Sequence, residues 1–228
     1  MRPGPTRRTP GAEPAPGLLP GPLRWPAWAL LGACVAVTAV LGTHFAGRRS
    51  PGRVDAAVDP RIQDVLTRFP ALLDRLPDLG DLMPGTVMTA ALILACLLSR
   101  RWRGAILAAA AVPAAAALTE YALKPLVGRT LGPSLSFPSG HATGMFALAA
   151  VCAILLLGPP GHRLPWAVRW PAALVTLAVA AAVAAAMVAI GAHYFTDAVA
   201  GAAVGTGTVL ACAGTVWSDR IMVSAARP

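Results

Sequence analysis

Residues 171–217 read PAALVTLAVAAAVAAAMVAIGA-HYFTD-AVAGAAVGTGTVLACAGTVW, two apolar runs separated by a short polar segment. Each run has about the 20 residues that a helix needs to cross roughly 30 Å of hydrocarbon. Asp197 is the only Asp, Glu, Lys or Arg in the whole stretch. This pattern predicts two membrane-spanning helices whose connection carries His193 and Asp197.

The same pattern recurs along the chain and predicts an all-α bundle of six transmembrane helices. Of the 228 residues, 56% are hydrophobic and 13% are charged, whereas soluble domains have roughly 25% charged residues. In the last apolar run, Gly201-x-x-x-Gly205 fits a face on which two helices can approach closely. The expected spans are residues 25–46, 82–99, 104–123, 141–158, 171–192 and 198–217.

The segments at the ends of the chain are predicted to lie outside the membrane. Residues 1–24 hold seven prolines and four arginines, with little apolar surface to bury, and predict a disordered tail. Residues 218–228 form a second short tail. The first span follows a basic segment like that of a signal peptide. Its apolar core is long and no A-x-A cleavage site follows, so a retained signal anchor is expected.

Residues 47–81 form an outer loop with an amphipathic pattern. Its apolar residues follow the i, i+3, i+4, i+7 spacing of one helix face, with Asp59-Pro60 at the expected helix start and a break at Pro70. This helix either lies on the membrane beside the outer loops or packs on the bundle with no part in chemistry. Arg61, Arg68 and Arg75 recur every seven residues on its polar face. Either they are solvated, or Arg68 or Arg75 reaches the site.

Charge predicts the orientation of the chain. The formal net charge is +9, and 18 of the 19 basic residues are Arg, the exception being Lys124. These charges punctuate the apolar runs instead of clustering on one polar face, which argues against a nucleic-acid partner. One side of the predicted bundle carries 11 basic residues and the other 8. The positive-inside rule therefore predicts cytoplasmic termini. The four cysteines stand in separate apolar runs, and no metal site is predicted.

Two polar clusters stand at the ends of predicted spans. The first contains Lys124, Arg129 and the stretch Phe137-Pro-Ser-Gly-His141, and it joins spans three and four. The second is His193-Tyr-Phe-Thr-Asp197, which joins spans five and six. Because consecutive spans cross in alternate directions, both connections must lie on the same side of the membrane. The sequence therefore predicts that two histidines share one surface with both cations.

This set of side chains suits phosphoryl transfer, which needs a nucleophile, a proton donor, and cations or N–H groups for the phosphate oxygens. Ser139-Gly140-His141 opens a helix whose free N–H groups favour a bound phosphate. Asp197 follows His193 by four residues, where a carboxylate can hold the imidazole and fix its tautomer. Each residue alone fits an interfacial anchor, but together on one side they predict a phosphoryl-transfer site.

Pro138-Ser-Gly-His141 followed by His193-x3-Asp197 resembles the type 2 phosphatidic acid phosphatase (PAP2) superfamily. That superfamily also includes undecaprenyl-diphosphate phosphatases and the soluble vanadium haloperoxidases. The resemblance covers about residues 120–205, and it implies metal-independent hydrolysis of a lipid phosphate without a cofactor. By this resemblance His193 is the nucleophile that forms a phosphohistidine, Asp197 orients it, and His141 protonates the leaving group. The phosphate is then held by Lys124, Ser139 and the Gly140 N–H.

Two positions depart from the family pattern. The first motif of the family places Arg-Pro where this chain has Leu131-Gly132, and Arg129, two residues earlier, is expected to substitute in holding phosphate. The third motif places Ser-Arg where this chain has Ala186-Met187. Losing one charge-assisted donor costs on the order of 10²–10³ in rate. The alternative to a phosphatase is therefore a catalytically degenerate protein of this fold that binds lipid phosphates without hydrolysing them.

Two further functions fit the sequence less well. A transporter would need charged residues near the middle of its spans, and the predicted spans have essentially none. Haloperoxidase chemistry belongs to soluble scaffolds. We therefore expect a multi-pass protein of the cell membrane with its site on the extracytoplasmic side. Its expected substrate is an isoprenoid or glycerolipid that carries a phosphate or diphosphate, and the sequence leaves the exact lipid and the oligomeric state open.

Overall fold

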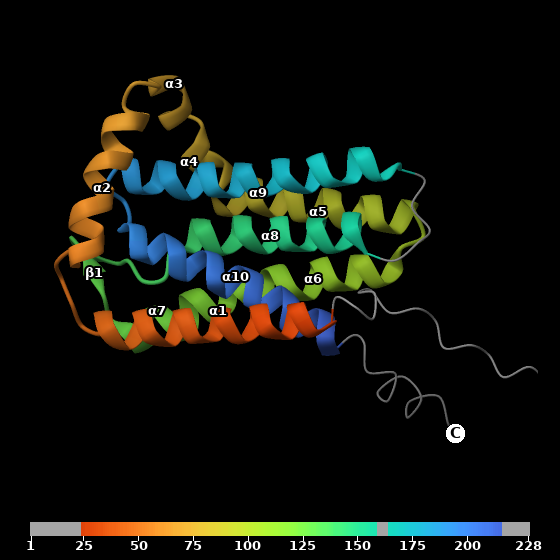
Figure 1. The fold of residues 1–228 in the computed structure, drawn as a ribbon, viewed down its shortest axis with the longest axis horizontal. Helices are drawn as coiled ribbons and strands as arrows, with labels where there is room; N and C mark the ends of the chain where they lie inside the picture. Colours follow the sequence, from red (N-terminus) through yellow and green to blue (C-terminus); the bar gives the residue numbers. More distant parts are fainter. Residues whose placement is uncertain (1–23, 159–163, 216–228) are drawn as a thin grey trace, which may run out of the picture.

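A computed structural model describes residues 24–158 and 164–215, and in it the long helices run side by side along one axis (Figure 1). The predicted tails, residues 1–24 and 218–228, lie outside this description apart from Arg24. The elements in chain order are α1 (Arg24–Phe45), α2 (Arg53–Leu66), α3 (Pro70–Leu73), α4 (Leu76–Leu79), α5 (Leu82–Leu98), α6 (Trp102–Ala117), η2 (Leu118–Leu123), α7 (Lys124–Val127), β1 (Thr130–Leu131), β2 (Ser134–Leu135), α8 (Gly140–Leu157), α9 (Trp166–Ala189) and α10 (Phe195–Thr215).

Within the described residues, five helices are long and apolar enough to cross a membrane. They are α1, the continuous run of α6, η2 and α7, and the helices α8, α9 and α10. The remaining predicted span, residues 82–99, corresponds to α5, which has 17 residues and follows α3 and α4 at a bend of 64°. α9 begins at Trp166, five residues before the expected start, so that Pro171 lies inside the helix.

α8 and α10 form the centre of the bundle. α8 packs against α10, α9 and α6, and about half of α8 and of α10 is buried, compared with 11% of α1. α1 packs along α10 and leaves the rest of its apolar surface exposed. An apolar groove of about 670 Å³ runs between α1, α10 and the η2–α7 region. None of the residues predicted for the site lines this groove.

The predicted glycine face joins α10 to α8. A Cβ atom added at Gly201 would lie 2.5 Å from the carbonyl oxygen of Ser139, and one added at Gly205 would lie 2.3 Å from that of Thr143. No side chain fits at such distances, so the two backbones approach as closely as they do only because both residues are glycine. The GxxxG motif thus fixes the start of α8 against α10.

The outer loop of residues 47–81, called the outer segment from here on, packs on the end of the bundle. α2 contacts α9 and α10 and runs across their ends (Figure 1). The expected start at Asp59-Pro60 is wrong, because α2 begins at Arg53, where the Gly52 N–H donates to Asp55 Oδ2 at 2.9 Å. This bond satisfies a backbone group at the helix start. The expected break is confirmed, since α2 ends at Leu66 and α3 begins at Pro70.

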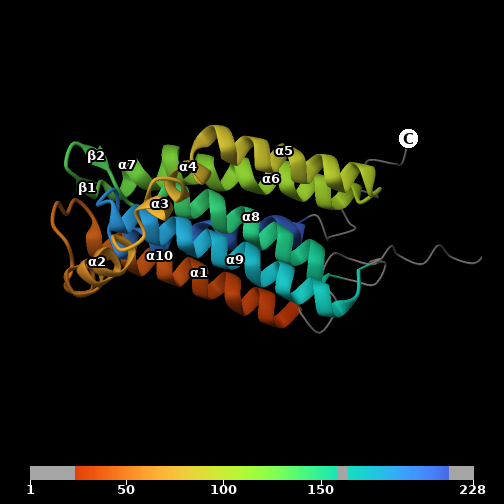
Figure 2. The same cartoon turned by 90° about the horizontal axis from the view of Figure 1, so that it is seen from above.

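The elements that carry the two polar clusters gather at one end of the bundle. Figure 2 shows α2, α7, β1 and β2 together at this end, with the long helices extending away from it. β1 and β2 form a short antiparallel hairpin that pairs Thr130 with Leu135. The connection between α5 and α6 lies at the opposite end (Figure 1). Both predicted site loops therefore share one side, as the alternation of spans requires.

Gly205→Ala should destabilise the protein, because its new methyl group would meet the backbone of α8. Overpacking of this kind costs typically about 1–3 kcal/mol, so the thermal unfolding midpoint in detergent should fall by several degrees. Gly144→Ala is the matched control, since Gly144 lies on α8 and a Cβ there meets nothing within 4 Å. That change should be neutral or stabilising by up to about 1 kcal/mol. Equal midpoints for the two variants would contradict the close α8–α10 contact.

Candidate active site

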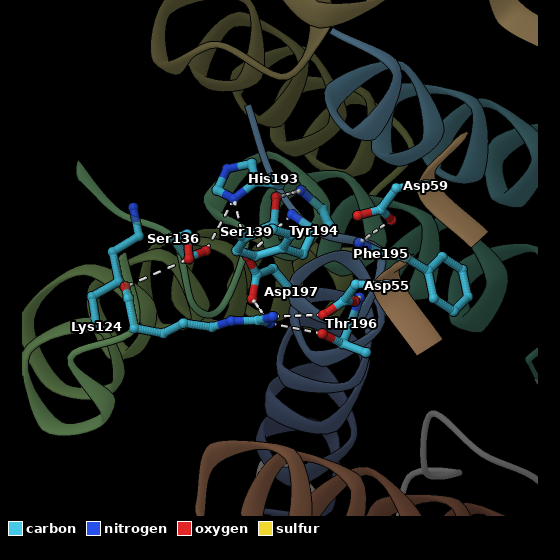
Figure 3. Close-up of polar contacts among 12 residues, drawn as sticks. Asp55, Asp59, Lys124, Ser136, Ser139, His193, Tyr194, Phe195, Thr196 and Asp197 are labelled. Carbon is cyan, nitrogen blue, oxygen red and sulfur yellow. Dashed lines mark hydrogen bonds and ion pairs between the residues drawn. The ribbon is translucent and has the colours of Figure 1, made fainter. Parts of the chain in front are cut away.

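His193 lies on the turn between α9 and α10, with its ring held by a backbone carbonyl. Nδ1 is 3.0 Å from the carbonyl oxygen of Ser136 (Figure 3). Because a carbonyl only accepts, Nδ1 carries the proton and the lone pair is on Nε2. Asp197 Oδ2, the expected orienting group, is 4.0 Å from Nδ1 and instead accepts the Tyr194 N–H at 3.2 Å. The tautomer suits a nucleophile at Nε2.

The environment of His193 keeps its imidazole neutral. Burial first, and then the positive charges of Lys124 and His141, lower the pKa of His193 to about 4, against the opposing effect of the Ser136 hydrogen bond. The ring therefore stays unprotonated above about pH 4. A nucleophile needs this form, since an imidazolium has no lone pair to donate.

His141 lies opposite His193 at the start of α8. The two ring centroids are 6.5 Å apart and the rings are tilted by 59°. His141 Nε2 is 3.1 Å from Asp81 Oδ1, and Asp81 stands at the N-cap position of α5. The sequence did not indicate Asp81, because 60 residues separate it from its partner. The outer segment thus supplies a carboxylate to the histidine expected to act as the acid.

The first turn of α8 provides free N–H donors. Ser139 is the N-cap, and its hydroxyl accepts the Ala142 N–H at 3.4 Å, while its side chain is fully buried. The N–H groups of Gly140 and His141 have no acceptor inside the helix, and no hydrogen bond joins them to any other described residue. Ser139 N–H donates to the Asp197 carbonyl at 3.0 Å, which ties the two histidine motifs together.

Lys124 follows a π-helical turn, η2, and begins α7. Such turns within longer helices are frequent at functional sites. The Lys124 ammonium is 2.7 Å from Oε1 and 2.9 Å from Oε2 of Glu120. Glu120 in turn lies against the first residue of α8, since a Cβ added at Gly140 would be 2.7 Å from its Oε1. Sequence reasoning placed Lys124 in the site and missed Glu120.

Arg129 occupies a different place from the one expected of a phosphate ligand. Its side chain is fully buried, with its guanidinium nitrogens 2.6 Å from Asp55 Oδ2 and 2.6 Å from Asp197 Oδ1. It also donates to Thr196 Oγ1 at 2.7 Å. Its guanidinium is therefore committed to two carboxylates and a hydroxyl, and it is not available as the substitute for the missing motif arginine.

Two aromatic rings enclose the same guanidinium. The Arg129 Cζ is 3.8 Å from the ring centroid of Phe45 and 4.2 Å from that of Tyr194. Cation–π contacts of this kind are strongest where water is excluded. Arg129 Nε is buried without a hydrogen-bond partner among the described residues, so the rings and carboxylates must together compensate its desolvation. The result is a rigid polar core behind His193.

α2 contributes two carboxylates to this core (Figure 3). Burial opposes ionisation of Asp55, but hydrogen bonds from Gly52, Thr196 and Arg129 lower its pKa overall. Asp59 Oδ1 accepts the Phe195 N–H at 3.0 Å. Burial first, and then the nearby charges of Asp55 and Asp197, raise the pKa of Asp59 to about 6.

The outer segment reaches the site through its aspartates. The three arginines of its predicted polar face are exposed, and their guanidinium groups make no hydrogen bond or ion pair with a described residue. These residues are Arg61, Arg68 and Arg75. The expectation that Arg68 or Arg75 holds phosphate remains a prediction.

The two departures from the family pattern are both apolar in the structure. Met187 is 6% exposed and sits in the core of α9, while its carbonyl accepts the N–H groups of Ala192 and His193 at 3.0 and 3.2 Å. Leu131 is half-buried in β1. Among the described residues, Lys124 is thus the motif cation that remains for a phosphate. The backbone N–H groups at the start of α8 must supply the other contacts.

Comparison with known proteins confirms the predicted resemblance. Residues 115–221 match the PAP2 superfamily. The fold resembles the crystal structure of a transmembrane PAP2-type phosphatidylglycerolphosphate phosphatase from Bacillus subtilis, with a TM-score of 0.61 and 16% identity. The match covers 83% of this chain and 94% of that one. A search of curated proteins finds no significant match. The all-α membrane bundle expected from the sequence is therefore confirmed.

Arg129→Met should strongly destabilise the protein, because it leaves Asp55 and Asp197 buried without their cation. Breaking a buried pair costs about 3–5 kcal/mol, which lowers the unfolding midpoint in detergent by at least about 6 °C. Arg61→Met is the matched control on an exposed arginine of α2 and should stay within about 0.5 kcal/mol of the parent.

Adding Asp55→Asn to Arg129→Met should recover part of the loss, since one unpaired carboxylate is then removed. Equal unfolding midpoints for Arg129→Met and Arg61→Met would contradict the buried network.

Proposed function

We propose that this chain, whose residues 115–221 match the PAP2 superfamily, hydrolyses a phosphate or diphosphate monoester of a lipid through a phosphohistidine. The observation that carries the proposal is the state of His193, whose Nδ1–H is bound by the Ser136 carbonyl while Nε2 keeps its lone pair. A second histidine lies 6.5 Å away and Lys124 is close enough to affect the pKa of His193. These groups provide a nucleophile, an acid and a cation.

In the first step Nε2 of His193 attacks the phosphorus in line with the leaving oxygen. The new N–P bond forms as the P–O bond breaks, and its electron pair moves to the leaving oxygen. His141 donates a proton to that oxygen, so the lipid leaves as a neutral alcohol or as a protonated phosphate. Lys124 and the N–H groups of Gly140 and His141 hold the equatorial oxygens.

In the second step water hydrolyses the phosphohistidine. His141, now without its proton, accepts one from the attacking water, and the N–P bond breaks with its electron pair returning to Nε2. Inorganic phosphate is released and His193 recovers its initial tautomer. The reaction balances without a metal ion or an organic cofactor, and activity should therefore persist in EDTA.

A lipid substrate fits the position of the site. The histidines lie at the ends of membrane-spanning helices, where a head group can enter while its apolar tail stays in the bilayer. The similar Bacillus subtilis structure is that of a phosphatidylglycerolphosphate phosphatase, so a glycerolipid phosphate is the first substrate to test. Isoprenoid phosphates and diphosphates form the second group.

A lipid-phosphate binding protein without catalysis is the second candidate. The apolar Met187 and Leu131, together with the burial of Arg129, favour it because they leave few cations for a transition state. His193, His141 and Asp197 argue for catalysis, since binding alone requires neither a nucleophile nor an acid. Turnover dependent on His193 separates the two functions.

His193→Ala should abolish phosphate release, lowering kcat/KM by at least about 10³-fold because the nucleophile is lost. Purified protein should be assayed with a panel of lipid phosphates in the presence of EDTA. Acid-labile ³²P should be trapped on the parent protein and should be absent from the His193→Ala variant. Thr176→Ala, far from the site on α9, is the control. Turnover in His193→Ala equal to that of the parent would refute the mechanism.

The proposed orientation places the site outside the cytoplasm, as the positive-inside rule predicts. In a variant without native cysteines, single cysteines at Ser134 and at Arg68 should react with a membrane-impermeant maleimide in intact cells. Both residues are exposed at the site end of the bundle. A cysteine at Ser99, exposed at the other end, should react only after the cells are opened. The opposite pattern would mean that the orientation is inverted. Labelling of only one of the cysteines at Ser134 and Arg68 would contradict the prediction that both lie on the same side of the membrane.

A further inference from the structure

The place expected for a substrate phosphate already holds a carboxylate. Glu120 binds Lys124 through both oxygens, at 2.7 and 2.9 Å, and its Oε1 lies 2.7 Å from the position of a Cβ added at Gly140. The same added atom would lie 3.9 Å from the Lys124 ammonium. Cation, carboxylate and the start of α8 therefore meet at one point.

This arrangement cancels the charge that a phosphate needs. Lys124 is the motif cation left for the site once Arg129 is committed to Asp55 and Asp197, and its ion pair with Glu120 is locally neutral. An arriving phosphate would meet an anion beside its only motif cation, and like charges at contact distance repel. The two cannot both occupy the start of α8.

The side chains differ in their freedom to move. The Glu120 side chain is 46% exposed, whereas that of Lys124 is 16% exposed. Glu120 can therefore rotate outward to solvent or head groups while Lys124 stays.

We propose that Glu120 is an internal competitor of the substrate, which occupies the phosphate position in the resting protein and must move aside when a phosphoryl group binds. It weakens binding of every phosphate species at this position, including the inorganic phosphate that the reaction releases. Glu120 thus sets the affinity of the site for phosphate and limits product inhibition. This inference rests on the proposed phosphate site, but it does not require turnover.

Glu120→Gln tests the inference, because it keeps the shape of the side chain and removes the competing charge. The dissociation constant of inorganic phosphate should be measured by equilibrium dialysis with ³²P on purified protein. It should fall by at least about 10-fold in Glu120→Gln, about 1.4 kcal/mol of binding free energy. The inhibition constant of phosphate against a hydrolysed lipid should fall in parallel.

Asp74→Asn is the matched control, since it removes one exposed carboxylate of the outer segment and should change the phosphate dissociation constant by less than about 2-fold. Glu120→Ala should tighten binding as Glu120→Gln does, which separates loss of charge from a new amide contact. The unfolding midpoint of each variant shows whether a loss of phosphate binding comes from misfolding. Misfolding cannot explain a gain in phosphate affinity.

The outcomes separate this inference from the proposed function. Tighter phosphate binding in Glu120→Gln without His193-dependent hydrolysis supports the competitor role and refutes the phosphatase. Hydrolysis that depends on His193, with equal phosphate affinity in parent and Glu120→Gln, keeps the phosphatase and overturns the competitor role. Weaker binding in Glu120→Gln, or no measurable binding in either protein, also overturns it.

Discussion

The buried guanidinium of Arg129 is the interaction on which the site depends. Removing a charge from water costs several kcal/mol unless close partners compensate it, and Arg129 has carboxylates of Asp55 and Asp197 at 2.6 Å each. One partner comes from α2 and the other from α10, so the ion pairs can form only if the outer segment docks across the end of the bundle. Phe45 of α1 covers one face of the guanidinium. A single side chain therefore holds three separate parts of the chain in register behind His193.

Backbone contact between α8 and α10 then sets the distance between the histidines. Gly201 and Gly205 allow the helices to touch, and the Ser139 N–H donates to the Asp197 carbonyl at 3.0 Å. Because the two histidine motifs occupy the facing ends of these helices, their rings are held 6.5 Å apart. Such placement does not rely on mobile loops, and fixed groups are what electrostatic catalysis needs.

The sequence predicted the features that depend on local pattern. Apolar runs indicated the spans, the GxxxG motif indicated a packing face on α10 without naming its partner helix, and alternation of spans put His141 and His193 on one side. It failed where partners are far apart in the chain or lack a side-chain signature. The role of Arg129 depends on Asp55, 74 residues away, and a backbone carbonyl, that of Ser136, holds His193. Helix periodicity marked α2 as amphipathic, but it could not say that aspartates, rather than arginines, face the site.

The charge balance of the site bears on whether so few cations can support catalysis. Losing a cation that acts only in the transition state lowers the rate by about 10²–10³, whereas losing one that binds substrate and transition state equally raises KM without lowering kcat. The N–H groups of Gly140 and His141 are fixed, partly shielded from water and without other partners among the described residues. Donors of this kind gain strength as negative charge grows on the phosphoryl oxygens. The proposed lipid substrate would also be concentrated in the bilayer, which offsets weak head-group affinity. The missing arginines are therefore compatible with the proposed phosphatase, in which phosphate is held loosely and transferred through His193.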